Sequence, residues 1–346
     1  VKNNGCAQSR IRGVVRWSAP RRRAAICREP FNIQRMEDRA EEEAELWRTD
    51  RYVPASKSRE NLHKSDADLL CKMIDGVSTS IRSFKPSPSL ADMSSSCIQQ
   101  REEIDVVCSG GGLKGYFVIG ARHVLENQLG MRNLHIRRVA GASAGAWAAM
   151  FMASGVSTAD WLKTYTFTRA AFDSGDSSKV LEAYREQIMP WLQHSLPKDA
   201  FLRCRGRCFI SISVLDRYGF LPRNIMVSDF TSNDDLVNAC FASSCIPFLL
   251  ETGLGPRFRG MRVVDGGLTN NTPCFTDGKR RQIVLRLEHV PYDWRAFMMP
   301  CDPCIEALAL NGALMMARFL EGRDCGMAIS WHAEEGSNLC VNRIPT

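Results

Sequence analysis

Apolar residues after residue 100 follow two different spacings, one typical of buried strands and the other of helices. Short β-branched runs predict strands at 104–108, 135–140, 208–215, 225–228, 261–265 and 283–290. Between them, apolar positions recur every three or four residues and predict helices at 115–129, 144–154, 159–172, 180–194, 234–243 and 303–320. Strands that alternate with helices in this way indicate an α/β fold with a mainly parallel sheet.

The first 100 residues differ in composition from the rest. Residues 1–36 carry nine Lys or Arg and one acid, Glu29, a balance found in organelle transit peptides but also in disordered basic tails and translated non-coding extensions. A charged helix is predicted at 39–48 and a short amphipathic helix at 69–81. Because 83–96 is rich in Ser and Pro, we interpret it as a linker. We therefore expect residues 1–100 to be a low-order extension and residues 101–346 to be one domain.

Ser143 lies in the pentapeptide Gly141-Ala142-Ser143-Ala144-Gly145, directly after a predicted strand and before an alanine-rich helix. A serine flanked in this way, on a sharp strand-to-helix turn, has a hydroxyl lifted clear of the backbone and available as a nucleophile. The two glycines would be required because a side chain at either position would collide with the neighbouring strand or helix. A tight turn in a packed core is the alternative interpretation.

Residues 110–115 form a glycine-rich loop, with the sequence GGGLKG, between a predicted strand and a predicted helix. Its backbone N–H groups would hold an anion, either a phosphate or the oxyanion of acyl transfer. The spacing of Gly110, Gly112 and Gly115 also fits a dinucleotide-binding loop, but Glu126 lies inside the predicted helix rather than at the end of a second strand. The Gly-Lys-Ser/Thr sequence of a Walker-type loop is missing.

Asp265 ends the β-branched strand 261–265 and is followed by Gly266 and Gly267. A glycine turn at the end of a strand would hold this carboxylate and keep its approach open. A type I′ hairpin is the alternative interpretation, because Asp-Gly is a common signal for that turn.

These three motifs, in this order, resemble those of the patatin-like phospholipase family. The resemblance covers about residues 104–320 and is supported by the alanine- and serine-rich segment 239–248 and by 270–273, Asn-Asn-Thr-Pro. Ser109 stands where many members of the family carry an aspartate. The resemblance implies a three-layer α/β/α sandwich with a mainly parallel central sheet, formed by residues 101–346.

The resemblance also implies a serine acyl hydrolase that cleaves fatty-acyl esters of membrane lipids, of the phospholipase A or lysophospholipase type. Ser143 would attack the ester and form an acyl-enzyme, and Asp265 would accept the proton directly, with no histidine between them. The backbone N–H groups expected to hold the oxyanion are those of Gly110, Gly111, Gly112 and Ala144. The remaining motif glycines are Gly115, Gly141, Gly145, Gly266 and Gly267.

Partners follow from the same resemblance. We expect a phospholipid or other lipid ester as substrate, a membrane surface bound peripherally, and no metal or organic cofactor. Lys114 is a candidate for contact with a lipid phosphate, whereas Arg137 and Arg138 are expected to be solvated surface residues. The aromatic residues near the motifs are expected to pack in the core, with an acyl channel as the alternative: Phe117, Trp147, Phe151, Trp161 and Phe167.

Several other functions are open at this point. A triacylglycerol lipase or general esterase of the same family differs only in its substrate, and a non-catalytic lipid-binding protein could use the same fold. An α/β-hydrolase triad would have the chain order Ser, Asp, His, which His289 and His332 both satisfy. A nucleotide-binding protein is supported by the glycine-rich loop alone.

Composition limits the remaining possibilities. The chain has 346 residues, a formal net charge of +7 and 45% hydrophobic residues, which suits a globular domain with a sizeable core. No nucleic-acid-binding motif is present. Pairs of closely spaced residues among the 14 cysteines, such as Cys301 and Cys304, fall in different predicted elements, which argues against a zinc site. No secretory signal is recognisable, so we expect reduced thiols and an intracellular location. Cys108 and Cys240 lie in apolar runs and are expected to be buried.

The uncharged stretch 139–156 is rich in Gly, Ala and Ser, so a buried strand, turn and helix explains it better than a membrane span.

Overall fold

In the computed structural model, the described residues are 63–81, 101–162, 189–215, 221–246, 256–290 and 304–332, and all of them lie in the unit formed by residues 33–346. The predicted basic segment, the charged helix at 39–48 and the linker at 83–96 lie outside these residues. Of the helices predicted at 159–172 and 180–194, residues 159–162 and 189–194 are described and are helical, and the rest lies outside the described residues.

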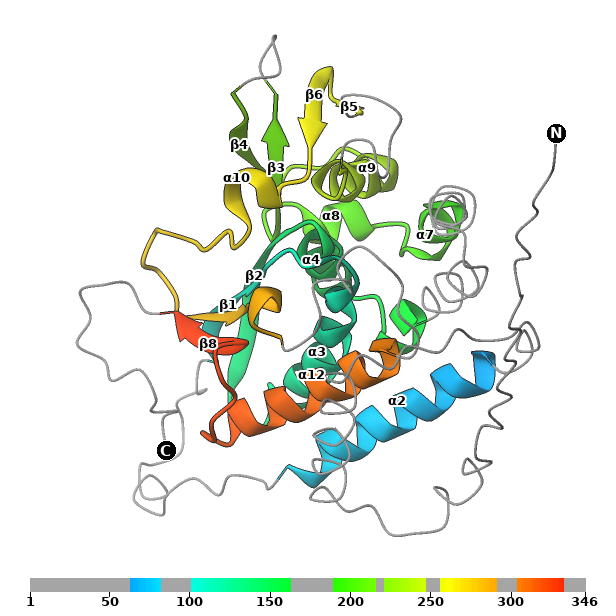
Figure 1. Cartoon of the computed structure of the whole chain (residues 1–346), viewed down its shortest axis with the longest axis vertical. Helices are drawn as coiled ribbons and strands as arrows, with labels where there is room; N and C mark the ends of the chain where they lie inside the picture. The colour runs from blue at the N-terminus through cyan, green and yellow to red at the C-terminus, as the bar shows by residue number, and fades with distance from the viewer. Residues whose placement is uncertain are drawn as a thin grey trace, which may run out of the picture. The chain divides into compact units, whose positions relative to one another are not determined.

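Eight strands in the described residues form one mixed sheet in the order β5-β6-β3-β2-β1-β7-β8, with β4 paired to β3 (Figure 1). Four central strands are mutually parallel: β1 (Glu102–Cys108), β2 (Leu134–Ala142), β3 (Cys208–Val214) and β7 (Gln282–Leu285). The strands that pair in the antiparallel sense are β4 (Arg223–Val227), β5 (Arg257–Phe258), β6 (Met261–Val264) and β8 (Ile329–His332). The expected α/β sandwich with a mainly parallel central sheet is therefore confirmed.

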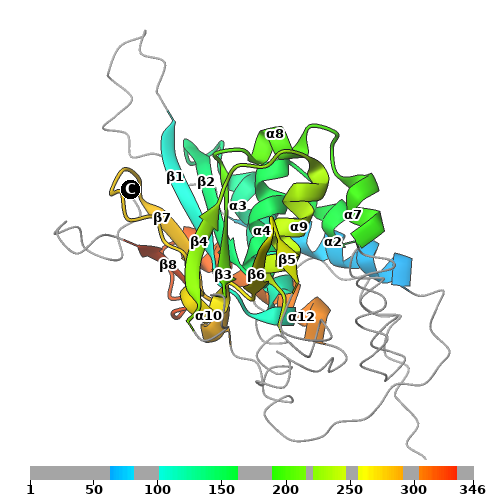
Figure 2. The ribbon, with the colours of Figure 1, turned by 90° about the horizontal axis from the view of Figure 1, so that it is seen from above.

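Helices surround this sheet and are, in chain order, α2 (His63–Ser80), α3 (Gly115–Gln128), α4 (Ala144–Ser154), α7 (Met189–Ser195), α8 (Ala200–Cys204), α9 (Asn233–Ser243), α10 (Gly267–Asn270) and α12 (Cys304–Leu320). Figure 2 shows α3, α4 and α9 together on one side of the strands. Two short 3₁₀ turns, η3 (Gly112–Lys114) and η5 (Leu287–His289), follow β1 and β7. In the described part of the chain, no helix is both long enough and apolar enough to cross a lipid bilayer.

Most predicted elements agree with the structure, and the differences have local causes. The strand predicted at 283–290 ends at Leu285, because the chain turns into η5 immediately afterwards. The helix predicted at 69–81 is α2, which begins six residues earlier. The sequence analysis missed the short elements α8, β5, β8 and α10, which are too brief for a periodic pattern. The apolar stretch 139–156 is the end of β2, a turn and α4, as expected.

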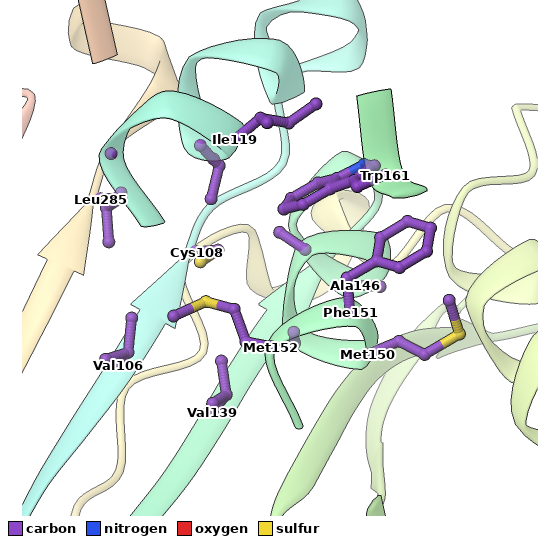
Figure 3. Packing of buried hydrophobic residues seen from close by; sticks show 14 of the residues in the cluster. Val106, Cys108, Ile119, Val139, Ala146, Met150, Phe151, Met152, Trp161 and Leu285 are labelled. Atoms are coloured by element: carbon purple, nitrogen blue, oxygen red, sulfur yellow. The ribbon is translucent and has the colours of Figure 1, made fainter. Parts of the chain in front are cut away.

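The two faces of the sheet bury different sets of side chains. Alternate residues of the central strands join the helices in a large core on one face. Figure 3 shows Met152 of α4 beside Val106 and Val139 of the sheet, and Phe151 stacked on Trp161 with ring centroids 4.7 Å apart. The opposite face carries a smaller cluster of Val107, Ala140 and Val284, packed with Phe209, Cys274 and Phe275. The two faces bury different residues because successive side chains of a strand point to opposite faces of the sheet.

Several side chains expected in the core are buried there. Phe117, Phe151 and Trp161 are all at most 6% exposed, and Cys108 and Cys240 are fully buried. Burial raises the pKa of the Cys108 thiol to about 12, so this group stays a neutral apolar side chain. Trp147 is only partly buried, and Phe167 lies outside the described residues.

Arg138 is the main departure from the expected surface. Its guanidinium donates hydrogen bonds to the fully buried Asp105 carboxylate at 2.5–3.1 Å and to Asp277 at 2.8 and 3.0 Å. It also lies 3.9 Å from the centroid of the Phe275 ring. These hydrogen bonds hold the pKa of Asp277 down at about 2. The prediction that Arg138 is a solvated surface residue is therefore wrong. Arg138 of β2 is paired with Asp105 of the neighbouring strand β1, and the two side chains form an ion pair.

Removing this guanidinium is expected to destabilise the protein strongly. Arg138→Leu leaves the Asp105 carboxylate buried without its counter-ion, which should lower the free energy of unfolding by about 3 kcal/mol. The matched control is Arg137→Leu, because Arg137 is 52% exposed and meets Glu103 only at 3.9 Å. Urea denaturation of both variants tests this expectation, and equal losses would contradict it.

Candidate active site

Ser143 and Asp265 meet because two strands end against the same edge of β3. Just before β3, the Arg207 carbonyl accepts a hydrogen bond from the Val139 N–H of β2. Just after β3, the Leu215 N–H donates a hydrogen bond to the Arg262 carbonyl of β6. Residues 207 and 215 are an even number of positions apart, so these groups point to the same side of an extended strand. β2 runs parallel to β3, whereas β6 runs antiparallel to β3. The carboxyl ends of β2 and β6 therefore point toward each other. Ser143 and Asp265 are the residues that follow these two ends.

The turn that carries Ser143 is tight and strained. Ser143 has φ 53° and ψ −124°, a left-handed backbone conformation that a residue with a side chain rarely adopts. A Cβ at Gly141 would lie 2.0 Å from the Gly145 carbonyl oxygen, and one at Gly145 would lie 2.1 Å from the Cys108 carbonyl oxygen. Both glycines are therefore required by close backbone contacts, as the sequence analysis expected.

The Ser143 hydroxyl donates a hydrogen bond to Asp265 Oδ2 at 2.6 Å. Ser143 is 7% exposed, and Asp265 is half-buried. Burial raises the pKa of Asp265, while the hydrogen bonds from Ser143 and from the Gly267 N–H act in the opposite direction. A carboxylate with a raised pKa, in direct contact with an alcohol, can accept its proton more readily than an exposed aspartate can.

The segment after Asp265 is a helical turn, α10, and is held to β3 by serine side chains. Ser213 Oγ donates to the Asp265 carbonyl at 2.8 Å, and Ser211 Oγ donates to the Asn270 carbonyl at 3.0 Å. Gly266 has φ −62°, an ordinary helical value. The type I′ hairpin considered for Asp-Gly is therefore excluded, because the chain continues into α10 instead of returning as a strand.

The glycine-rich loop lies against both motifs. A Cβ at Gly110 would lie 3.0 Å from the Ser143 Cβ, so the loop approaches the nucleophile itself. The Gly110 N–H donates to the Asn271 carbonyl at 3.1 Å and is not free for an oxyanion in this structure. The N–H groups of Gly111, Gly112 and Ala144 have no acceptor in the part of the chain that the structure describes. These three keep their predicted role as oxyanion donors, whereas Gly110 would have to break its bond to Asn271.

Ser109 connects this loop to η5. Its hydroxyl donates to Glu288 Oε2 at 2.7 Å and accepts from the Leu287 N–H at 2.8 Å. A Cβ at Gly111 would lie 2.5 Å from the Leu287 Cβ, so the loop also packs closely on this turn. Ser109 thus fixes the start of the glycine-rich loop by contacts that serine can make as both donor and acceptor.

Lys114 does not extend into solvent. Its side chain is 8% exposed, and Nζ donates to the Val290 carbonyl at 3.2 Å. Burial lowers its pKa, while the charge of Glu288 acts in the opposite direction. A contact between Lys114 and a lipid phosphate stays a prediction, and it requires the ammonium group to leave this carbonyl.

Neither candidate histidine stands between the serine and the aspartate. His332 ends β8, which is separated from β2 by β1 and β7, and the usual strand spacing places it about 14 Å away. His289 lies in η5 with an exposed side chain, rather than at the end of a long strand. The structure therefore favours a Ser–Asp pair over a Ser–Asp–His triad.

Two residues with contacts to the site had no role in the sequence analysis. Ser243 and Asn271 lay inside the segments 239–248 and 270–273, which supported the resemblance only as sequence patterns. Asn271 joins the aspartate loop to the glycine-rich loop through its carbonyl, and Ser243 accepts a hydrogen bond from the Ser143 N–H. No pattern in the sequence shows these contacts, because they join segments about 100 to 160 residues apart.

A serine on a tight strand-to-helix turn, at the carboxyl end of a parallel strand, occupies the position of the nucleophile in α/β hydrolases. The family model described as patatin-like phospholipase matches residues 106–276. Over that region the chain is similar to this family, whose members are lipid hydrolases and acyltransferases.

Curated relatives match about half of the chain. Human omega-hydroxyceramide transacylase is 29% identical over 173 residues, which are 48% of this chain and 31% of the relative. Human 1-acylglycerol-3-phosphate O-acyltransferase PNPLA3 is 32% identical over 181 residues, which are 49% of this chain and 35% of the relative. The matched region thus spans about a third of the length of these relatives. Among solved structures, the ExoU–SpcU complex of Pseudomonas aeruginosa is similar with a TM-score of 0.35 and 17% identity, over 67% of this chain and 53% of that chain.

The raised pKa of Asp265 predicts a pH-dependent effect on stability. A carboxyl group with a folded pKa above its ordinary value near 3.8 favours the folded state when protonated, and this stability is lost as the pH rises through the folded pKa. Asp265→Asn carries no charge, so it should gain stability relative to the wild type as the pH rises from 4 to 8. Urea denaturation across that range measures the difference, and a difference independent of pH would contradict the expectation.

Replacing the histidines is expected to have little effect on catalysis. His289→Ala and His332→Ala should keep nearly the full rate of ester hydrolysis, because neither side chain lies between Ser143 and Asp265. Steady-state kinetics on a soluble ester tests both variants. A loss of about 10³-fold in either would indicate a triad instead.

Proposed function

We propose that this protein is a serine acyl hydrolase that cleaves fatty-acyl esters of membrane lipids, of the phospholipase A or lysophospholipase type. The observation that carries the proposal is the direct hydrogen bond of 2.6 Å from Ser143 Oγ to Asp265 Oδ2. Similarity to a family of lipid hydrolases and acyltransferases supports the class of substrate.

In the first half-reaction, Ser143 Oγ attacks the ester carbonyl while its proton passes to Asp265 Oδ2. The carbonyl oxygen becomes an oxyanion, stabilised by the backbone N–H groups of Gly111, Gly112 and Ala144, which have no acceptor among the described residues. Collapse of this intermediate breaks the bond to the lipid alcohol, which leaves with the proton from Asp265. The product on the enzyme is an ester between the fatty acid and Ser143.

In the second half-reaction, Asp265 takes a proton from water, and the resulting hydroxide attacks the acyl-enzyme. The second oxyanion collapses, Ser143 recovers its proton from Asp265, and the fatty acid is released. An exposed carboxylate is a weak base for an alcohol, because its ordinary pKa is near 3.8. Burial of Asp265 reduces that mismatch, and the direct contact lets the proton move together with the attack on the carbonyl.

Apolar side chains beside the pair fit a lipid substrate. Leu268 follows Asp265 by three residues and is 64% exposed. Trp147 lies one helical turn after Ser143 and is only partly buried, with its indole N–H bonded to Ser244. We infer that these residues face the acyl chain or the membrane surface, to which the protein would bind peripherally.

Transfer of the acyl group to a lipid alcohol is a second candidate function. Two of the relatives are named as a transacylase and an acyltransferase. Both activities share the acyl-enzyme on Ser143 and differ only in whether water or an alcohol attacks it. The ratio of the two products therefore distinguishes them.

Hydrolysis of a lipid panel tests the proposed function. Wild-type protein is expected to release fatty acid from phosphatidylcholine or lysophosphatidylcholine in mixed micelles, and Ser143→Ala and Asp265→Asn should each lose about 10³-fold or more. Mass spectrometry of the same reactions, with a lysophospholipid acceptor added, detects any newly formed ester. Preferential cleavage of triacylglycerol would identify a lipase of the same family.

A fluorophosphonate probe provides the control for a non-catalytic protein. The wild type should be labelled at Ser143, and Ser143→Ala should not be labelled at all. A folded wild type that neither reacts with the probe nor hydrolyses any ester would support the lipid-binding alternative. Thermal stabilisation by a nucleotide would support the nucleotide-binding alternative.

A further inference from the structure

The edge of β3 has a gap between the ends of β2 and β6. Ser211 is the last residue of β3 that pairs with β2, and Ser213 is the first that pairs with β6. The Ser211 carbonyl points into this gap, because a Cβ at Gly266 would lie 1.9 Å from its oxygen. A buried carbonyl at such a position needs a hydrogen-bond donor from elsewhere in the chain.

The Ser243 hydroxyl fills this gap. It donates to the Ser211 carbonyl at 2.6 Å and accepts from the Ser143 N–H at 2.9 Å. Ser211 and Ser243 are fully buried. The Ser243 hydroxyl therefore bridges the Ser143 N–H, just after β2, and the Ser211 carbonyl of β3 by two hydrogen bonds.

The backbone at the end of α9 contacts the other loop of the site. The Ser243 carbonyl accepts from the Gly266 N–H at 2.8 Å, and the Cys245 carbonyl accepts from the Asp265 N–H at 2.7 Å. Carbonyl groups at the end of a helix have no partner within the helix and are free for such contacts. Ser243 thus touches the serine turn with its side chain and the aspartate loop with its backbone.

We propose that Ser243 is a positioning residue, which holds Ser143 in its strained backbone conformation and so fixes the distance between its hydroxyl and Asp265. The inference rests on the proposed function, in which Ser143 is the nucleophile and Asp265 the base. With φ at 53°, Ser143 would relax if its N–H lost its acceptor, because that conformation persists only where surrounding contacts impose it. A shift of the nucleophile by about 1 Å can slow a reaction about 100-fold.

Reaction with a fluorophosphonate probe tests this role separately from lipid binding. Ser243→Ala leaves the Ser143 N–H and the Ser211 carbonyl without their partner. Its second-order labelling rate at Ser143 is expected to fall roughly 10- to 100-fold. On a soluble ester, kcat should fall while KM stays close to the wild-type value, since Ser243 is buried and does not meet the substrate.

The matched control is Ser154→Ala. Ser154 is also a fully buried serine and lies on α4 itself, but its hydroxyl donates to the Phe151 carbonyl of the same helix. Its removal should lower the Tm and leave the labelling rate at Ser143 unchanged. If Ser154→Ala slowed labelling as much as Ser243→Ala, the effect would be general destabilisation, and the positioning role would be overturned.

Two further variants at the same position keep the test decisive if Ser243→Ala does not fold. Ser243→Cys keeps a side chain of similar shape, but the thiol is a weak donor and acceptor, so labelling should stay slow. Ser243→Thr keeps the hydroxyl and should restore much of the rate. A folded Ala or Cys variant that labels as fast as the wild type would overturn the positioning role.

The outcomes separate this inference from the proposed function. Normal labelling of Ser243→Ala, together with loss of activity in Ser143→Ala and Asp265→Asn, would overturn only the role of Ser243. A wild type that labels at Ser143 but cleaves no lipid ester would overturn the proposed function, while the comparison of labelling rates still decides the role of Ser243. A wild type that does not label would overturn both.

Discussion

The arrangement of the site depends on one edge of β3, which pairs with β2 and then with β6 along its length. Because these two strands approach from opposite directions, the residues at their ends face each other across a short gap. The hydrogen bond between Ser143 and Asp265 follows from this geometry, although the two residues are 122 positions apart in the chain. Every other contact of the site, from the glycine-rich loop to the end of α9, packs around this junction.

Close backbone contacts keep the junction in place. The glycines on either side of Ser143 let β2, α4 and the end of β1 approach more closely than side chains would allow. The strain at Ser143 is offset by burial of α4, whose residues pack on the sheet and on its neighbouring helices. The site therefore combines a packed apolar base with a small set of buried hydroxyl and backbone hydrogen bonds.

The sequence predicted the parts of the fold that depend on local pattern. Strands β1, β2 and β3 were predicted to within about two residues from their short apolar runs, and α4 was predicted to the residue, with Gly155 directly after its end. The family resemblance predicted that Ser143 and Asp265 would meet. The contacts of Arg138, Gly110 and Ser243 could not be predicted, because each depends on which strands become neighbours. Strand order is a property of the whole chain, and no local pattern encodes it.

The region matched by the family model, 106–276, is smaller than the compact unit in which it lies. β7 pairs with β1 along its parallel edge, and α12 covers α3 so closely that a Cβ at Gly120 would lie 1.8 Å from the Ala309 carbonyl oxygen. α2 adds a further layer, with Leu70, Ile74 and Val77 buried. A protein trimmed to the matched residues would expose the inner edge of β1 and the apolar face of α3, and such surfaces promote aggregation. For this chain, the boundaries of sequence similarity are thus a poor guide to the boundaries of an autonomously folding fragment.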